Sequence, residues 1–209
     1  MTRLNNIYTG STTSNRHTTK ESCYIQGNLF EVPNGKLGWY PKMVYRFVDQ
    51  LEVMLTHSRC VMAVRFDLRM TGYSESNKIM TIFWRRLGKR LGKKYGSLKL
   101  GYIWAREQER AKQQHYHVVM LVDKDTIHYS GIVTDAVIET WRRITDLQAH
   151  IPKNPYYIVK PDDWKSFSRV LERMTYLAKF RGKGYRPAQT KDFGSSRIKP
   201  LNNGGFIHA

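Results

Sequence analysis

Two apolar runs joined by a short polar segment constrain the fold of this chain more than any other feature. The runs are Leu98–Glu107 and Gln114–Asp123, and they are joined by the segment QERAKQQ, whose last residue is Gln114. A connection this short can join neighbouring strands as an antiparallel hairpin, whereas parallel strands need a crossover of a dozen or more residues. We therefore predict a mainly antiparallel sheet, and an α+β fold if helices accompany it.

Helical patterns do accompany these strands. Leu37–His57 carries apolar residues at helical spacing after Pro41, and SESNKIMTIFWRRLGKRLGKKYG predicts a basic amphipathic helix ended by Gly96. Further helices are predicted at about 131–147 and 162–181, with a short strand near Tyr156–Val159.

A third strand is predicted at Cys60–Met70, where apolar and polar residues alternate. Arg65, Asp67 and Arg69 share one side of it, so we expect a half-buried strand with a polar, mostly basic outer face.

The length of 209 residues suits one domain. The polar composition of both ends predicts a flexible arm over residues 1–22 and a flexible tail over residues 198–209, with the domain at 23–197. Cys23 and Cys60 suggest no disulfide framework, and we see no secretory leader or apolar run of the ~20 residues that a membrane helix needs. We expect a cytoplasmic protein.

The charge points to a polyanionic partner. The chain has 35 Lys and Arg against 17 Asp and Glu, a net charge of +18. Such a surplus is typical of proteins that bind nucleic acid. We predict phosphate contacts from the following basic residues: Arg65, Arg69, Arg85, Arg86, Lys89 and Arg173. Four aromatic residues are candidates for base stacking, although most are expected in the core: Trp84, Trp104, Tyr116 and Tyr156.

Two histidines stand one residue apart at the head of the second apolar run. In a strand, residues two apart point to the same side, so His115 and His117 project together. Glu107, at the end of the preceding strand, is placed to supply a carboxylate. Two imidazoles and one carboxylate leave coordination positions open for water or substrate, as a catalytic metal requires.

The helix predicted at 162–181 adds a tyrosine in an unusual place. Its apolar stripe contains Phe167, Val170, Leu171, Met174 and Ala178. Tyr176 lies off that stripe, on the polar side, and Lys179 follows three residues later. A tyrosine hydroxyl presented to a metal-activated phosphate can act as a nucleophile, and a lysine beside it can stabilise the phosphate charge.

Together, HYH on a strand, an upstream glutamate and YLAK on a downstream helix resemble the three motifs of the HUH endonucleases. The segments RFDLR, YIWAREQE, HYHVVMLVDKD, PKNPYY, MTYLAKF and DFGSSR further resemble the replication initiation proteins of filamentous phages of the inovirus type and their prophage relatives. The likeness covers roughly residues 40–197. It implies an antiparallel sheet of about five strands with helices packed behind it.

The resemblance assigns roles to individual residues. It makes His115 and His117 metal ligands, Tyr176 the nucleophile and Lys179 the lysine of a Y-x-x-K motif. Glu107 matches the carboxylate ligand, but Glu109 and Asp67 are rivals. Tyr185 is either a second catalytic tyrosine or, as we favour, a DNA contact in a glycine-rich loop.

The implied reaction nicks single-stranded or extruded origin DNA with the help of Mg²⁺ or Mn²⁺. Attack by Tyr176 leaves a 3′-hydroxyl primer and a 5′-phosphotyrosine, and a second transfer closes the displaced strand in rolling-circle replication. The sequence has no G-x-x-x-x-G-K-[ST] segment, so the resemblance implies a helicase of the bacterial host as partner.

Two other functions fit parts of the pattern. A DNA-binding regulator would need the fold and the charge but would cut nothing. A single-tyrosine transposase or a small relaxase would use the same chemistry on other DNA. A zinc hydrolase is disfavoured, because no H-E-x-x-H segment is present.

Overall fold

The computed structural model describes residues 17–33, 35–108 and 113–201. In these ranges the chain forms, in order, β1 (Ser22–Ile25), β2 (Asn28–Glu31), the 3-10 helix η2 (Gly35–Leu37), α1 (Pro41–His57), β3 (Val61–Arg69), α2 (Lys78–Tyr95), β4 (Gly101–Glu107), β5 (His115–Asp123), α3 (Ser130–Thr145), β6 (Tyr156–Val159), α4 (Trp164–Leu177) and β7 (Phe193–Ser195).

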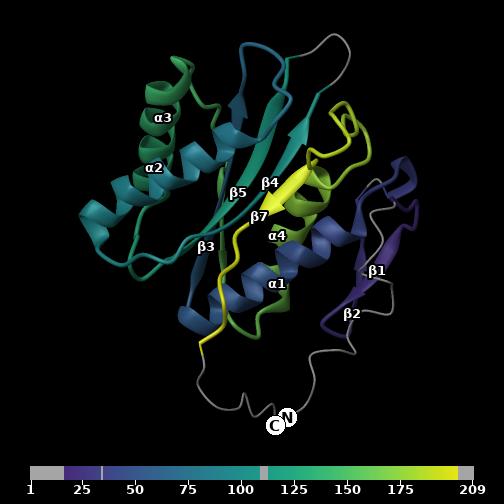
Figure 1. Cartoon of the computed structure of the whole chain (residues 1–209). Coiled ribbons are helices and arrows are strands. Elements are labelled where there is room, and N and C mark those ends of the chain that lie inside the picture. Colours follow the sequence, from purple (N-terminus) through teal and green to yellow (C-terminus); the bar gives the residue numbers. More distant parts are fainter. Residues whose placement is uncertain (1–16, 34, 109–112, 202–209) are drawn as a thin grey trace.

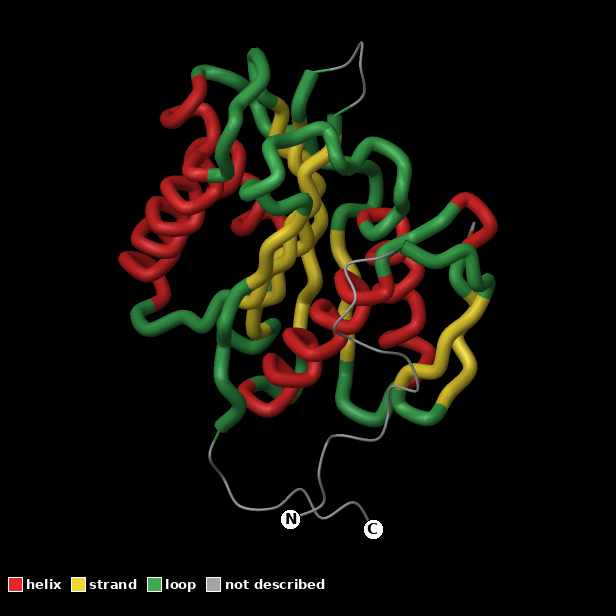
Figure 2. The backbone as a smooth tube through the Cα atoms, turned by 45° about the vertical axis from the view of Figure 1, so that its right-hand side comes forward, coloured by secondary structure: helices red, strands yellow, loops and turns green. Residues whose placement is uncertain are grey.

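The central sheet has five strands in the order β6-β3-β5-β4-β7, and every neighbouring pair is antiparallel. The fold is therefore α+β, as predicted. Helices flank the strands on both sides (Figure 2). Helices α1 and α4 lie on one side of the sheet, and α2 and α3 lie on the other (Figure 1). We call these sides the α4 face and the α2 face.

Alternation along the strands divides the core in two. On β5, Val119 and Leu121 pack into the cluster formed with α1 and α4. Val118 and Met120 pack into the cluster formed with α2 and α3. Both faces of the central strands are covered, as expected for a sheet between two helical layers.

The predicted exposure of β3 is wrong. Arg65 and Asp67 do share one side of the strand, but only 8% and 9% of their surfaces are accessible. Their side is covered because Arg65 lies under the ring of Tyr176 on α4. Only Arg69, the last residue of the strand, is exposed as predicted.

The last predicted helix is shorter than expected. Helix α4 ends at Leu177, so Lys179 lies beyond it and not on its last turn. The chain turns here because it pairs with the segment before α1: the Tyr40 amide donates to the Ala178 carbonyl, and the Phe180 amide donates to the Gly38 carbonyl. Lys179 itself bridges to Trp39 in this pairing.

Two parts of the fold were not anticipated. Strands β1 and β2 form a hairpin whose turn residues, Gln26 and Gly27, both have positive φ, as a type I′ turn requires. Strand β7 pairs with β4 at the edge of the sheet, in a segment too rich in glycine and serine to look like a strand.

The division into arm, domain and tail stays a prediction. Residues 1–16 and 202–209 of the arm and tail lie outside the described residues. At the inner end of the arm, Thr18 exchanges two backbone hydrogen bonds with Trp39, at 2.8 and 2.9 Å. No helix in the described ranges has the length and apolar character needed to cross a membrane.

Candidate metal centre and its neighbouring tyrosine

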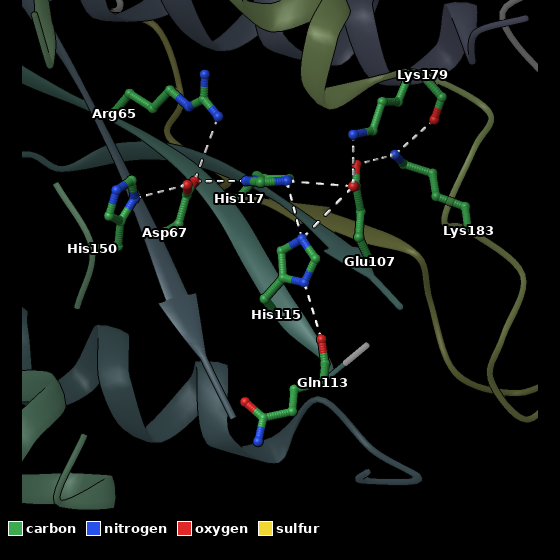
Figure 3. Close-up of polar contacts among 9 residues, drawn as sticks. All are labelled: Arg65, Asp67, Glu107, Gln113, His115, His117, His150, Lys179 and Lys183. Carbon is green, nitrogen blue, oxygen red and sulfur yellow. Dashed lines mark hydrogen bonds and ion pairs between the residues drawn. The ribbon is translucent and has the colours of Figure 1, made fainter. Parts of the chain in front are cut away.

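The predicted cluster forms at one end of the central strands, on the α4 face. Register places Glu107 of β4 opposite His115 of β5, and Asp67 of β3 opposite His117. These four residues therefore point to the same side of the sheet. Figure 3 shows their side chains converging around His117.

Glu107, His115 and His117 are spaced as ligands of one metal ion would be. The Nε2 atoms of the two histidines are 3.2 Å apart. Glu107 Oε2 lies 3.3 Å from Nε2 of His117 and 3.8 Å from Nε2 of His115. Two ligand atoms at about 2.1 Å from one ion, at angles of 90° to 110°, are about 3.0 to 3.4 Å apart. The two distances from Nε2 of His117 lie in this range, and the 3.8 Å between Glu107 and His115 corresponds to a wider angle of about 130°. The group can therefore hold a metal ion.

The outer nitrogens of the histidines strengthen this conclusion. Nδ1 of His117 lies 2.6 Å from Asp67 Oδ1, and Nδ1 of His115 lies 3.2 Å from the Gln113 carbonyl oxygen. Each Nδ1 faces an acceptor and is thus the nitrogen that carries the proton in the neutral ring. Both Nε2 lone pairs then face each other and the Glu107 carboxylate. These three acceptors, the two Nε2 atoms and the carboxylate, would repel one another at such short distances. A cation, either a proton or a metal ion, must therefore lie between them.

The pKa shifts show how the cluster binds a proton. Burial lowers the pKa of His117, but its contacts with Asp67 and Glu107 outweigh that effect, so the pKa is raised. Burial and the neighbouring His117 lower the pKa of His115. His117 is therefore protonated before His115.

Asp67 was predicted as a possible metal ligand, but it lies on the other side of His117. Its Oδ1 accepts from His117 Nδ1, and its Oδ2 is 3.3 Å from Nδ1 of His150. It thus holds His117 in one tautomer and orientation, as the outer carboxylate of a carboxylate–histidine–metal arrangement does. Glu109, the other rival, lies outside the described residues.

Two lysines hold the Glu107 carboxylate. Lys179 Nζ is 3.0 Å from Oε2, and Lys183 Nζ is 3.0 Å from Oε1. Burial raises the pKa of Glu107, but His117, Lys183 and Lys179 lower it to about 2. The carboxylate is therefore charged and fixed in place at neutral pH.

Lys183 was missed in the sequence, where FRGKGYR looks like a solvated basic loop. Its side chain is fully buried and also donates to the Lys179 carbonyl oxygen at 2.8 Å. The preceding residue, Gly182, has φ +82°, and a β-carbon at this position would lie 3.4 Å from Glu107 Oε2. Such a packing is not visible in a local sequence pattern.

Tyr176 stands beside the cluster. The residue is 47% exposed, and the centre of its ring lies 5.9 Å from the centre of the His117 ring. Lys179 Nζ lies 4.3 Å and Arg65 Cζ lies 5.1 Å from the centre of the same tyrosine ring. The structure thus brings together the tyrosine, the predicted lysine and the predicted metal ligands.

The predicted DNA contacts fall into two groups. Arg65 and Arg173 are near Tyr176 or its helix, and Arg69 lies opposite His115. Arg85, Arg86 and Lys89 are exposed on α2, on the other face of the sheet.

The aromatic candidates divide in a similar way. Trp84, Trp104 and Tyr116 are buried in the core, and Tyr156 is exposed. Tyr185, 48% exposed, follows Gly184 in the loop after α4, which is the kind of loop predicted for it.

Comparison with known proteins gives two matches. A family model described as YagK/YfjJ C-terminal domain matches residues 26–196, which include every element from β2 to β7. The chain is also similar to the uncharacterized protein YagK of Escherichia coli strain K12, with 26% identity over 113 residues. That match covers 46% of this chain and 54% of YagK, about half the length of the relative. No solved structure matches the chain.

Proposed function

The chain belongs to the YagK/YfjJ C-terminal domain family, and from its site we propose that it is a metal-dependent endonuclease that nicks single-stranded origin DNA through Tyr176. In this proposal it is an HUH enzyme of the inovirus replication-protein type. It would start rolling-circle replication of a phage or prophage in the bacterial cytoplasm, with a host helicase opening the duplex.

One observation carries the proposal. A half-exposed tyrosine lies with its ring centre 5.9 Å from that of His117, next to three groups spaced to hold a metal ion. A tyrosine that served only packing would lie on the apolar stripe of α4. Tyr176 instead faces solvent and the cluster, where a bound phosphate would meet it.

The site residues would have two roles, binding the metal ion and attacking the phosphate. His115, His117 and Glu107 would hold the ion, and Asp67 would orient His117 through its hydrogen bond. Bound there, Mg²⁺ or Mn²⁺ would act as a Lewis acid on the scissile phosphate. The resemblance and not the geometry favours these two metals.

Tyr176 would perform the transfer. Its hydroxyl oxygen attacks the phosphorus and loses its proton, a P–O bond to the tyrosine forms, and the P–O3′ bond breaks. The departing oxygen takes up a proton and becomes the 3′-hydroxyl primer, while the 5′ end stays on the protein as a phosphotyrosine. One phosphodiester replaces another, so the later joining step needs no ATP.

Two cations would stabilise the charge of the phosphate. Lys179 Nζ lies 4.3 Å and Arg65 Cζ lies 5.1 Å from the centre of the Tyr176 ring. Arg65 is almost fully buried, and its Nε has no hydrogen-bond partner among the described residues. A buried guanidinium with an unused donor is suited to accept an anionic ligand.

Covalent capture of DNA tests the proposal. Labelled single strands from the intergenic regions of the source genome are incubated with the protein and Mn²⁺ or EDTA, then separated on a denaturing gel. We expect a labelled protein band with Mn²⁺, none with EDTA, and none with Tyr176→Phe. Tyr129→Phe is the matched control, because it removes the hydroxyl of an exposed tyrosine that lies before α3, and it should keep the band.

The outcome also separates the proposal from its rivals. Salt-sensitive binding without any covalent band, on either strand, would indicate a regulator that does not cut. A band formed only on paired transposon ends or on a transfer origin would keep the chemistry but indicate a transposase or a relaxase.

A further inference from the structure

A groove of about 770 Å³ leads to Tyr176 from the far end of α4. Helix α4 forms one wall, with Arg169, Arg173 and Tyr176. Strand β6 forms the other, with Tyr156 and Tyr157. The metal cluster lies outside this groove, so its lining has no part in the site described above except for Tyr176.

The helical wall is one continuous stripe. Ser166, Arg169, Arg173 and Tyr176 are three, four and three residues apart, which places them on one side of the helix. At a rise of 1.5 Å per residue, the stripe is about 15 Å long. The nucleophile stands at its end, so a ligand that fills the groove runs up to the reacting tyrosine.

The stripe offers unused positive charge. Neither Arg169 nor Arg173 forms an ion pair with any residue that the structure describes. The Nε of Arg173 is buried and lacks a hydrogen-bond partner within the same residues. Glu172 also lines the groove and offsets part of this charge. Two guanidinium groups with free donors are suited to phosphate oxygens.

The other wall offers aromatic surface. Tyr157 lies on the α4 side of β6, with its ring centre 6.0 Å from Cζ of Arg173. Tyr156 is 47% exposed and pairs with Val64 of the α2 face, so it lines the groove at its outer rim, at the open edge of β6. In the described sheet β6 is an edge strand paired only with β3, so nothing in the sheet covers its outer side. Exposed rings beside cations are what single-stranded nucleic acid binds, because an unpaired base can stack on the ring while its phosphate meets the cation.

We propose that this groove binds the unpaired nucleotides next to the cut, with phosphates held by Arg169 and Arg173 and a base that reaches over the open edge of β6 to stack on Tyr156 at the rim. The choice of DNA rests on the proposed function. A duplex is a poorer ligand, because its bases already stack on each other and present no free face to a tyrosine. The groove thus selects single strands and delivers them to Tyr176.

A binding assay separates the base contact from the charge contact. The protein carries Tyr176→Phe and the buffer contains EDTA, so cutting plays no part. Fluorescence anisotropy compares oligothymidylate of about a dozen nucleotides, within the span of known single-strand sites, with an abasic deoxyribose-phosphate strand of the same length and charge. We expect the thymidylate to bind about fivefold to 100-fold more tightly, the range of one stacked base.

Tyr156→Ala should remove most of that preference by weakening only thymidylate binding. Tyr129→Ala is the matched control, because Tyr129 is also an exposed tyrosine but lies before α3, away from the groove. A preference that survives Tyr156→Ala unchanged would overturn the stacking assignment.

Arg169→Ala should weaken both strands equally and lower the slope of log affinity against log salt by about 0.7, the value for one phosphate contact on a single strand. Lys165→Ala, an exposed cation of the same helix outside the groove lining, should change the slope less. Equal slopes for the two variants would contradict the phosphate assignment. These tests measure binding and not cutting. Their outcome is therefore independent of whether the protein forms the covalent band.

Discussion

The two faces of the central sheet are built by the same strands, but they carry different kinds of residue at the end of the strands where the candidate site lies. On the α2 face the core continues to the end of the strands, where Leu68 and Tyr116 are fully buried. Among the described residues there, the one buried charge is Arg106, which donates to the Ser74 carbonyl oxygen. On the α4 face the apolar core stops at Ala105, which lies opposite His117 and, beyond it, Asp67, and the next residue of β4 on this face is Glu107. These charged groups are also buried, so the difference is one of chemistry and not of exposure.

Buried charge is tolerated on the α4 face because each group has a partner. Removing a carboxylate from water costs several kcal/mol unless opposite charges and hydrogen bonds offset the loss. Glu107 meets two lysines and Asp67 meets His117. A network this complete, next to an exposed tyrosine, indicates that this face serves function while the α2 face serves stability.

The largest effect should come from His117→Ala. Loss of one of three ligand groups should reduce Mn²⁺-dependent covalent capture of DNA to background. Affinity for single-stranded DNA in EDTA should stay within about twofold, because phosphate contacts made elsewhere supply most of it. Denaturing gels and fluorescence anisotropy measure the two quantities. His128→Ala, at an exposed histidine away from the site, is the control. Equal loss of DNA binding and of covalent capture would contradict the assignment of function to the α4 face and of stability to the α2 face.

Asp67→Asn should have the next largest effect. The amide keeps an acceptor for His117 Nδ1 but loses the negative charge, which should weaken Mn²⁺ binding about 10- to 100-fold. Titration calorimetry with Mn²⁺ measures this directly. Asp135→Asn changes an exposed carboxylate of α3 and should leave the affinity unchanged. Unchanged affinity in Asp67→Asn would mean that Asp67 serves packing alone.

Tyr116→Phe makes the reciprocal test on the α2 face. The Tyr116 hydroxyl donates to Asn77 Oδ1 at 3.0 Å and accepts from the buried Gln114 Nε2 at 2.9 Å, so its removal leaves the Gln114 amide without this partner and takes one of two donors from Asn77 Oδ1. We expect the free energy of unfolding to fall by about 1–3 kcal/mol, measured by urea denaturation. Covalent capture at a temperature where the variant is folded should match that of the wild type. A loss of capture from this folded variant would show that the faces are coupled.

The smallest effect should come from the basic side of α2. Arg86→Ala and Lys89→Ala should each weaken single-strand binding a few-fold and lower the salt slope by about 0.7. The covalent band at saturating DNA should be unchanged, because these residues lie across the sheet from Tyr176. Salt titrations of both variants check the slope. A band lost at saturation would place α2 in the cutting step.

Local patterns in the sequence predicted much of this arrangement. Apolar spacing located α1, α2 and the β4–β5 hairpin, and alternation placed His115 and His117 on one side of a strand. The apolar stripe of α4 left Tyr176 outside the core. Each of these inferences depends on residues that are neighbours along one element.

What the sequence did not show depends on packing between elements. The burial of Arg65 and Asp67 follows from the position of α4 over β3. Lys183 reaches Glu107 because the chain turns after Leu177 to pair with the segment before α1. The groove between α4 and β6 exists only because these two elements lie side by side. The spacing of residues within one element cannot predict these contacts.

The most direct measurement is to locate the nucleotide on the protein. After incubation with single-stranded DNA and Mn²⁺, nuclease and trypsin digestion followed by mass spectrometry assigns the modified tyrosine. Cleavage after Lys and Arg separates Tyr176, in Met174–Lys179, from Tyr185, in Gly184–Lys191. We predict a nucleotide on Met174–Lys179 that is absent when EDTA replaces Mn²⁺. A nucleotide on Gly184–Lys191, or a covalent product that forms equally well in EDTA, would contradict a metal centre acting with Tyr176.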